Sequence, residues 1–238
     1  MKSISSVGII VLGLIVSAWA DSGDKERGRI TTAADVVKDT FNAPDKGVPL
    51  SVLNGTKCVI VIPDLKKAAF IVGGDYGRGV MTCRTGSNFK GPWSAPIMMA
   101  SGGGDIGLQL GVEGTDVVIL VLNEEGARSI QRSKVKLGAE ASVAAGPVGR
   151  TQEAATNEAM KAQMLSYSRS RGLFAGVSVS GMTLRVDGDA NENLYGRKVT
   201  SQQILQGEVT MPDEAKPLIA QIRKATAKAA QQEATKKK

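Results

Sequence analysis

The chain has 238 residues and a formal charge of +7, which arises from 30 lysines and arginines against 23 aspartates and glutamates. It contains no histidine, which excludes Ser-His-Asp catalysis, Cys-His catalysis and histidine-ligated zinc. Aromatic residues make up only 4% of the chain, so we expect no base-stacking surface and no nucleic-acid partner.

The first twenty residues, 1–20, have the form of a signal peptide. Lys2 precedes an apolar run at 7–16, and Ala18-Trp19-Ala20 has the small-x-small pattern of a signal peptidase site. Spanning a bilayer takes about 20 apolar residues, so the short run argues against the alternative of an uncleaved anchor. We therefore predict cleavage after Ala20 and export to the periplasm or out of the cell.

The next segment is expected to pass from a flexible lead into a helix. Residues 21–30 are polar and charged and form the predicted lead. Residues 31–42 place apolar side chains, among them Val37 and Phe41, at helical spacing, and either threonine at the start can cap the helix. Two interpretations stay open: the apolar side packs on a sheet, or it lies on a bilayer surface.

The rest of the chain is dominated by strand patterns. Apolar runs and alternating segments predict strands at 57–63, 68–72, 80–84, 97–100, 106–112, 117–122, 135–143, 162–167 and 173–186. Short helices are predicted at 123–131, 189–195 and 201–206, and a longer helix begins at Pro212. A basic tail rich in alanine, lysine and glutamine, 226–238, is expected to fray.

These elements predict an α+β fold. Its core is an antiparallel, glycine-rich sheet or barrel-like sheet, with short helices, an N-terminal amphipathic helix and a C-terminal helix. The 28 glycines fit this class because they permit bulges, tight bends and close backbone approach in strands. Cys58 and Cys83, the two cysteines of the chain, each lie in a strand-like run. They can form a disulfide if those strands are neighbours, or remain two small buried hydrophobic residues.

Two short motifs carry cofactor patterns but lack the required context. Gly102-x-Gly104-x-x-Gly107 matches the dinucleotide pattern, yet strand alternation follows it where a helix N-terminus is needed. Asp187-x-Asp189-x-Asn191 resembles the start of a calcium loop, but the later glycine and acid are missing, and a helix cap is the better interpretation. We predict no cofactor, no metal and, because no nucleophile and base share a credible motif, no enzyme.

The segment 167–181 is the most informative part of the chain. Arg169 and Arg171 alternate with hydroxyl side chains and can donate hydrogen bonds to phosphate oxygens. Lys66 and Lys67 form a second basic site in another predicted loop. For any one of these residues a solvated charged turn is the better interpretation, so an anion-binding surface requires that the loops converge.

Several segments, taken in order, resemble the SYLF domain family, also called the yeast-type actin-binding SYLF domain. The landmarks are Ala33-Ala34, Val36-Val37, the run from Cys58 to Pro63, Phe70-Ile71-Val72-Gly73-Gly74, Tyr76-Gly77-Arg78-Gly79, Trp93-Ser94-x-Pro96, Gly103, Gly107, Gln109, Gly111, Tyr167-Ser168-x-Ser170-x-Gly172-Leu173-Phe174-Ala175-Gly176-Val177-Ser178, Ala190-Asn191-Glu192 and Tyr195-Gly196. The resemblance covers residues 31–225. It departs at Val179-Ser180-Gly181, where the family usually has Leu-Glu-Gly.

The resemblance implies a non-enzymatic lipid-binding module. Eukaryotic members bind phosphoinositides and in some cases actin, whereas bacterial members are exported. For an exported protein it implies peripheral binding to an anionic phospholipid membrane surface, and actin is not expected as a partner. The lipid-binding residues would be Arg29, Lys38, Phe41, Lys66, Lys67, Arg169 and Arg171. The alternative is a structural envelope protein without a lipid site, whose basic tail, 224–238, binds a protein or a cell-wall polymer.

Overall fold

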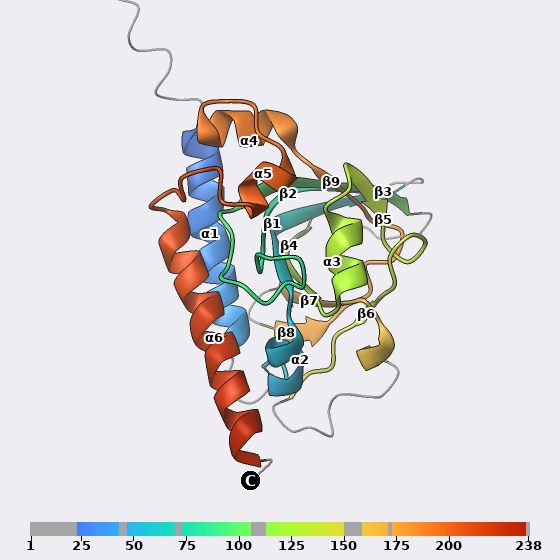
Figure 1. The fold of residues 1–238 in the computed structure, drawn as a ribbon. Coiled ribbons are helices and arrows are strands. Elements are labelled where there is room, and N and C mark those ends of the chain that lie inside the picture. Colours follow the sequence, from blue (N-terminus) through green and yellow to red (C-terminus); the bar gives the residue numbers. More distant parts are fainter. Residues whose placement is uncertain are drawn as a thin grey trace, which may run out of the picture.

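A computed structural model describes residues 23–42, 47–69, 73–105, 113–149, 159–170 and 173–236. The predicted signal peptide and the predicted strand at 106–112 lie outside these residues. Within the described residues, nine strands form one curled sheet, and helices pack on both of its faces (Figure 1). The predicted α+β class is confirmed.

The sheet is almost entirely antiparallel. Its strands run in the order β5-β9-β3-β2-β1-β4-β7-β6, and β8 pairs with the same edge of β7 as β6 does. Only β6 and β7 pair in parallel among the described strands. The strand bounds are β1 Cys58–Ala69, β2 Gly73–Cys83, β3 Ile97–Asp105, β4 Glu113–Val121, β5 Lys134–Lys136, β6 Val143–Ala145, β7 Met164–Ser170, β8 Leu173–Gly176 and β9 Thr183–Val186.

The helices divide into two groups around the sheet. Their bounds are α1 Asp24–Phe41, α2 Leu50–Gly55, α3 Glu124–Ile130, the short 3-10 helix η2 Ala159–Lys161, α4 Gly188–Tyr195, α5 Ser201–Leu205 and α6 Ala215–Lys236. Helices α1, α2, α4 and α6 contribute to one core, and α3 and α5 contribute to the other. The short helix predicted at 123–131 is confirmed as α3, and the Asn123 side chain caps it by accepting a hydrogen bond from the Gly126 amide.

Alternation along the central strands builds these two cores. In β1, Val59 and Val61 face the core beneath α1, while Cys58, Ile60 and Ile62 face the core beneath α3. Successive side chains of a strand point to opposite faces, and here both faces are covered. The continuous apolar runs of β1 and β4 therefore reflect burial on both sides.

The N-terminal helix begins earlier than the sequence indicated. Residues 24–30, expected as part of a flexible lead, belong to α1, and the hydroxyls of Thr31 and Thr32 donate to carbonyls one turn back instead of capping the helix. Acidic residues in the first turn favour the helix N-terminus, and Arg27 pairs with Glu214 at 2.9 Å. Tertiary contact thus extends a helix that polar composition alone did not predict.

The tail expected to fray is also helical. Helix α6 continues to Lys236, and its residues Thr226 and Ala229 are buried against the rest of the protein. Helices α1 and α6 lie side by side (Figure 1). Burial of one stripe holds α6 to the protein as far as Ala229, and the segment beyond it is rich in alanine, lysine and glutamine, which favour a helix intrinsically.

Three strand predictions need correction. Residues 68 and 69 do not start a new strand, because β1 runs on to Ala69 through a bulge at Pro63 and Asp64 that adds one residue relative to both neighbours, and 70–72 lie outside the described residues. Asp64 has a φ of +51°, and proline cannot donate to the ladder. Turns also divide the other two strands: 135–143 gives β5 and β6, and 173–186 gives β8 and β9.

The bulge explains part of the glycine pattern. A Cβ at Gly79 would lie 2.4 Å from the carbonyl oxygen of Val61, and a Cβ at Gly77 would lie 2.6 Å from the Ile62 side chain. Glycine is required at these two positions because β2 crosses β1 too closely for a side chain.

The cofactor motifs have structural roles. Gly102 and Gly104 lie in β3 and pair with β2, so the described part of the motif is strand. The Asp187 side chain caps α4 by accepting from the Ala190 amide, and buried Asn191 accepts from the amide of Met98. Among the described residues, no group of three or more metal-ligating side chains is found.

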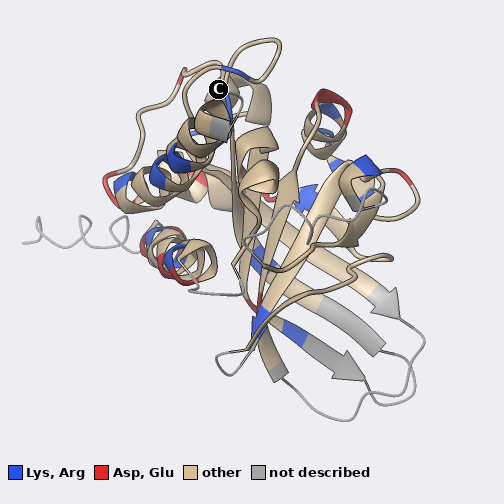
Figure 2. Cartoon of the chain, turned by 90° about the horizontal axis from the view of Figure 1, so that it is seen from below, with Lys and Arg blue, Asp and Glu red and all other residues tan. Residues whose placement is uncertain are grey.

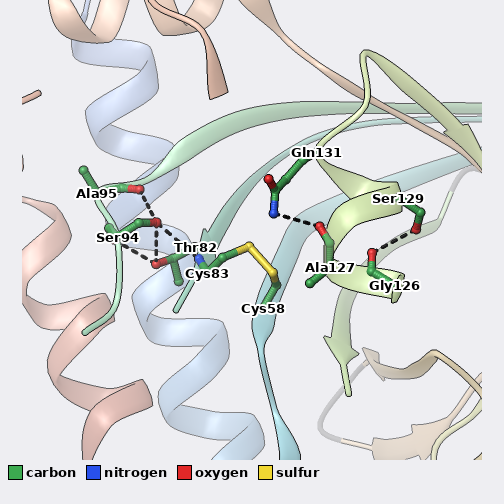
Figure 3. The surroundings of a disulfide bond; sticks show 9 residues. All are labelled: Cys58, Thr82, Cys83, Ser94, Ala95, Gly126, Ala127, Ser129 and Gln131. Carbon is green, nitrogen blue, oxygen red and sulfur yellow. Dashed lines mark hydrogen bonds between the residues drawn. A yellow bond between two sulfur atoms is a disulfide. The ribbon is translucent and has the colours of Figure 1, made fainter. Parts of the chain in front are cut away.

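The two cysteines form a disulfide. Cys58 and Cys83 lie opposite each other on the neighbouring strands β1 and β2. Both are fully buried, and the bond lies beside α3, which contributes Gly126 and Ala127 to its surroundings (Figure 3). Strand pairing therefore decides between the two alternatives that the sequence left open.

Candidate functional site

The described residues of the landmark segment 167–178 form the paired strands β7 and β8. The Tyr167 ring is fully buried and stacks on Phe174 at a centroid distance of 5.4 Å. A Cβ at Gly146 would lie 2.1 Å from the Tyr167 ring, and one at Gly176 would lie 2.0 Å from the Gly146 carbonyl oxygen. Tyr167 and Gly176 of this motif thus serve packing.

The basic residues of the hairpin are less available than the sequence indicated. The Arg169 guanidinium pairs with the carboxylate of Asp39 on α1, which ties β7 to that helix. Arg171 lies outside the described residues. Arg169 therefore already has a counter-charge within the protein.

The second predicted basic site does converge on the same end of the sheet. Lys66 lies opposite Gly114 of β4, and Asp116 of β4 lies opposite Arg169. However, Lys66 Nζ lies 2.7 Å from a carboxylate oxygen of Asp64. The backbone of Lys67 lies in β1, but its side chain is outside the described part. The predicted loop at Lys66 and Lys67 is wrong, because both residues belong to β1, just as Arg169 belongs to β7. Lys66 and Arg169 come to the same end of the sheet, yet each is paired with an acid.

Arg29 is positioned for structure rather than for contact with a surface. Its guanidinium is half-buried, and burial lowers the pKa of Arg29, partly offset by the charge of Glu26. Arg78 and Asp187, which lie 3.7 Å apart, complete this charged cluster between α1, β2 and α4. Arg29 therefore lies half-buried near the charges of Glu26, Arg78 and Asp187 rather than fully exposed at the surface.

The apolar face of α1 packs on the sheet. Ile30, Ala33 and Val37 are fully buried in the core, while Lys38 is exposed on the opposite side. Of the two interpretations of this helix, packing on the sheet is confirmed.

Figure 2 shows acidic and basic residues mixed along α1, whereas lysine and arginine predominate on α6.

Phe41, the last residue of α1, lies in a groove between α1, α2 and α6. The groove has a volume of about 580 Å³. Phe41, Leu50 and Leu53 contribute its apolar lining, and Lys224 and Lys228 line it from α6. None of the residues that line this groove, all of which are described, is aspartate or glutamate. The groove therefore combines an apolar surface with unopposed positive charge.

The sequence interpretation missed Lys224 and Lys228 as site residues because it placed them in or beside a fraying tail. Their spacing of four residues puts both on one side of a helix, next to each other. That spacing was visible in the sequence, but it has meaning only if the tail is helical. Among the described helices, none is both long enough and apolar enough to cross a membrane.

Comparison with known protein families identifies the family to which this chain belongs. The model of the Ysc84 family, described as "Las17-binding protein actin regulator", matches residues 102–225, just over half of the chain. The chain belongs to the Ysc84 (SYLF) family. The resemblance seen in the sequence is confirmed, and the family is described by binding and regulation rather than by catalysis.

Relatives in yeast and vertebrates match most of the chain. Protein YSC84 of Saccharomyces cerevisiae is 40% identical over 74% of this chain and 37% of its own length. LAS seventeen-binding protein 3 of the same species is 35% identical over 83% of this chain and 42% of its own length. SH3 domain-containing YSC84-like protein 1 of Xenopus laevis is 33% identical over 78% of this chain and 56% of its own length. The chain thus spans about half, or less, of these Ysc84-family relatives.

Proposed function

We propose that this Ysc84-family chain is an exported, non-enzymatic module that binds anionic phospholipids at a membrane surface. The groove between α1, α2 and α6 carries the proposal. An anionic phospholipid needs a positive site for its phosphate and an apolar surface for its acyl chains. Lys224 and Lys228 supply the first, and Phe41, Leu50 and Leu53 supply the second.

The groove supports the proposal better than the hairpin surface does. A basic residue near an anionic membrane contributes about 1 kcal/mol to binding. Lys66 and Arg169 must share their charge with Asp64 and Asp39, so each contributes less. The groove lysines have no carboxylate among the lining residues. The exposed Lys38 remains a candidate for a secondary contact.

The disulfide supports the proposed export. Disulfides persist in oxidising compartments such as the periplasm and the extracellular space. The Cys58–Cys83 bond is consistent with that environment. Within it, phosphatidylglycerol, cardiolipin or lipid A would be the anionic ligands, and actin would not be a partner.

Replacing both groove lysines, in Lys224→Gln with Lys228→Gln, is expected to weaken binding to phosphatidylglycerol-containing vesicles about 30-fold. Two lost contributions of about 1 kcal/mol each account for this change. Co-sedimentation of residues 21–238 with anionic and neutral vesicles, at low and high salt, measures it.

Arg223→Gln is the matched control because Arg223 is exposed on α6, next to Lys224, but does not line the groove. It should bind like the wild type. If Arg169→Gln abolishes binding while the lysine variant does not, the hairpin surface is the site and the groove is not. Absence of binding to every vesicle would overturn the lipid proposal.

A protein or cell-wall partner is the second candidate, favoured by the family description as a Las17-binding actin regulator. Deleting 224–238 cannot test it, because the deletion also removes groove lysines and buried Ala229. Deleting 236–238 removes three lysines and leaves every groove residue in place. Loss of envelope association with intact vesicle binding would favour this candidate.

A further inference from the structure

A second cavity lies at the core beneath α3, away from the lipid groove. Its volume is about 870 Å³, and it is framed by the loop from Arg84 to Pro92, the end of α3 and the end of α5. Phe89 and Leu205 provide apolar lining and pack with the core beneath α3. All lining residues are described, and none of them is aspartate or glutamate.

Three arginines line this cavity. Arg84 is half-buried, stacks over the Trp93 ring at 4.8 Å, and donates to the Gly91 carbonyl and the Thr226 hydroxyl at 3.3 and 3.5 Å. Burial lowers the pKa of Arg84, and no neighbouring carboxylate raises it. A partly desolvated guanidinium without an acidic partner is costly unless an anion neutralises it.

The other two arginines come from α3 and the turn that follows it. Arg128 lies over the Phe89 ring at 5.7 Å, donates to the Ser87 carbonyl at 2.9 Å and pairs with Glu124 at 3.3 Å. The Arg132 guanidinium makes no ion pair or hydrogen bond to any described residue. Arg132 is therefore available to a ligand, and Arg128 is held in place beside it.

Neutral donors and a fixed loop complete the cavity. Gln131, Gln202 and Gln206 line it and can donate hydrogen bonds without adding charge. Within the loop, Phe89 has a φ of +52°, which is strained for a residue with a side chain. Backbone bonds from Thr85 to the Pro92 carbonyl and from Gly91 to the Thr85 carbonyl, at 2.8 and 2.9 Å, hold this conformation.

We propose that this cavity is a binding site for phosphate-type oxyanions, with Arg84, Arg128 and Arg132 as the ligating residues. Guanidinium groups match the geometry of phosphate oxygens and bind them through paired hydrogen bonds. The cavity is large enough for a ligand with more than one phosphate. The same chemistry is offered by a soluble phosphate ester and by a phosphomonoester lipid head group. The site is separate from the groove and does not depend on the lipid proposal.

Calorimetric titration of residues 21–238 with inorganic pyrophosphate tests the soluble source, and co-sedimentation with phosphatidic acid vesicles tests the head-group source. Arg132→Gln is expected to weaken binding at least about tenfold, because it removes charge-assisted hydrogen bonds. Arg128→Gln with Arg132→Gln should abolish binding. Since Arg132 has no partner among the described residues, the single variant should fold and melt like the wild type.

The control variants separate this site from the groove. Arg223→Gln, and Lys224→Gln with Lys228→Gln, should bind pyrophosphate like the wild type. A loss of binding in Arg132→Gln with either probe supports the site and identifies its source. An Arg132→Gln variant that binds every probe as tightly as the wild type does would overturn this proposal and leave the groove proposal intact. Wild-type protein that binds neither probe would overturn this proposal and, because phosphatidic acid vesicles are anionic, would count against the groove as well.

Discussion

Replacing Tyr167 by alanine is expected to lower the free energy of unfolding by about 3–5 kcal/mol. The ring is fully buried, stacks on Phe174 and fills the space above Gly146. Its removal leaves a cavity between β7, β8 and the segment after β6. The backbone around this cavity is already closely packed, so it cannot move inward to fill the space. Urea denaturation followed by circular dichroism measures the effect.

Tyr167→Phe is the control, and we expect it not to lower the free energy of unfolding. The Tyr167 hydroxyl is buried and has no hydrogen-bond partner among the described residues, so its removal should leave the free energy of unfolding unchanged or raise it. A loss of stability close to that of the alanine variant would contradict the assigned packing role, because it would mean that the hydroxyl makes an essential bond.

Burial also raises the pKa of Tyr167, and this predicts how its contribution depends on pH. The unfolded chain ionises tyrosine near pH 10, whereas the folded protein keeps Tyr167 protonated at higher pH. Its contribution is therefore complete below about pH 10 and is lost as the pH rises further. Above about pH 10, the free energy of unfolding of Tyr167→Phe should therefore decrease less than that of the wild type. Burial also raises the pKa of Tyr195, which accounts for part of the decrease that the variant keeps.

Reducing the Cys58–Cys83 disulfide is expected to lower the free energy of unfolding by about 3 kcal/mol. The bond closes a loop with a sequence separation of 25 residues, and its loss enlarges the conformational freedom of the unfolded chain. Urea unfolding with and without reductant gives the difference directly, and reductant must be present throughout because the sulfurs are fully buried.

The double variant Cys58→Ala with Cys83→Ala separates the bond from other effects of the reductant. It should be as unstable as the reduced wild type, apart from a small packing loss, and reductant should not change it further. Two titratable thiols in unreduced, denatured wild-type protein would show that the bond does not form, and the prediction would fail.

The proposed groove and the proposed oxyanion site would place two separate positive surfaces on one folded core. Helix α1 is held to the sheet by its buried face and by the Arg169–Asp39 pair, so the proposed membrane contact is expected to occur with this helix in place. The two proposed sites share no lining residue, although Arg84 reaches Thr226 of α6, so the variants proposed for each can be tested separately.

The sequence by itself determined the class of fold, the family and much of the local structure. The apolar runs at Cys58–Ile62 and Val117–Val121 are continuous because both faces of these strands are buried. The start of α3 at Asn123 is readable from the sequence because a cap is a local hydrogen bond. Only the tertiary structure decided which side chains meet. Arg169 reaches Asp39 across 130 residues, and Arg84 shares a cavity with Arg128 and Gln202. Such contacts depend on strand register, on the bulge in β1 and on the packing that keeps α6 helical, and periodicity in the sequence carries no information on them.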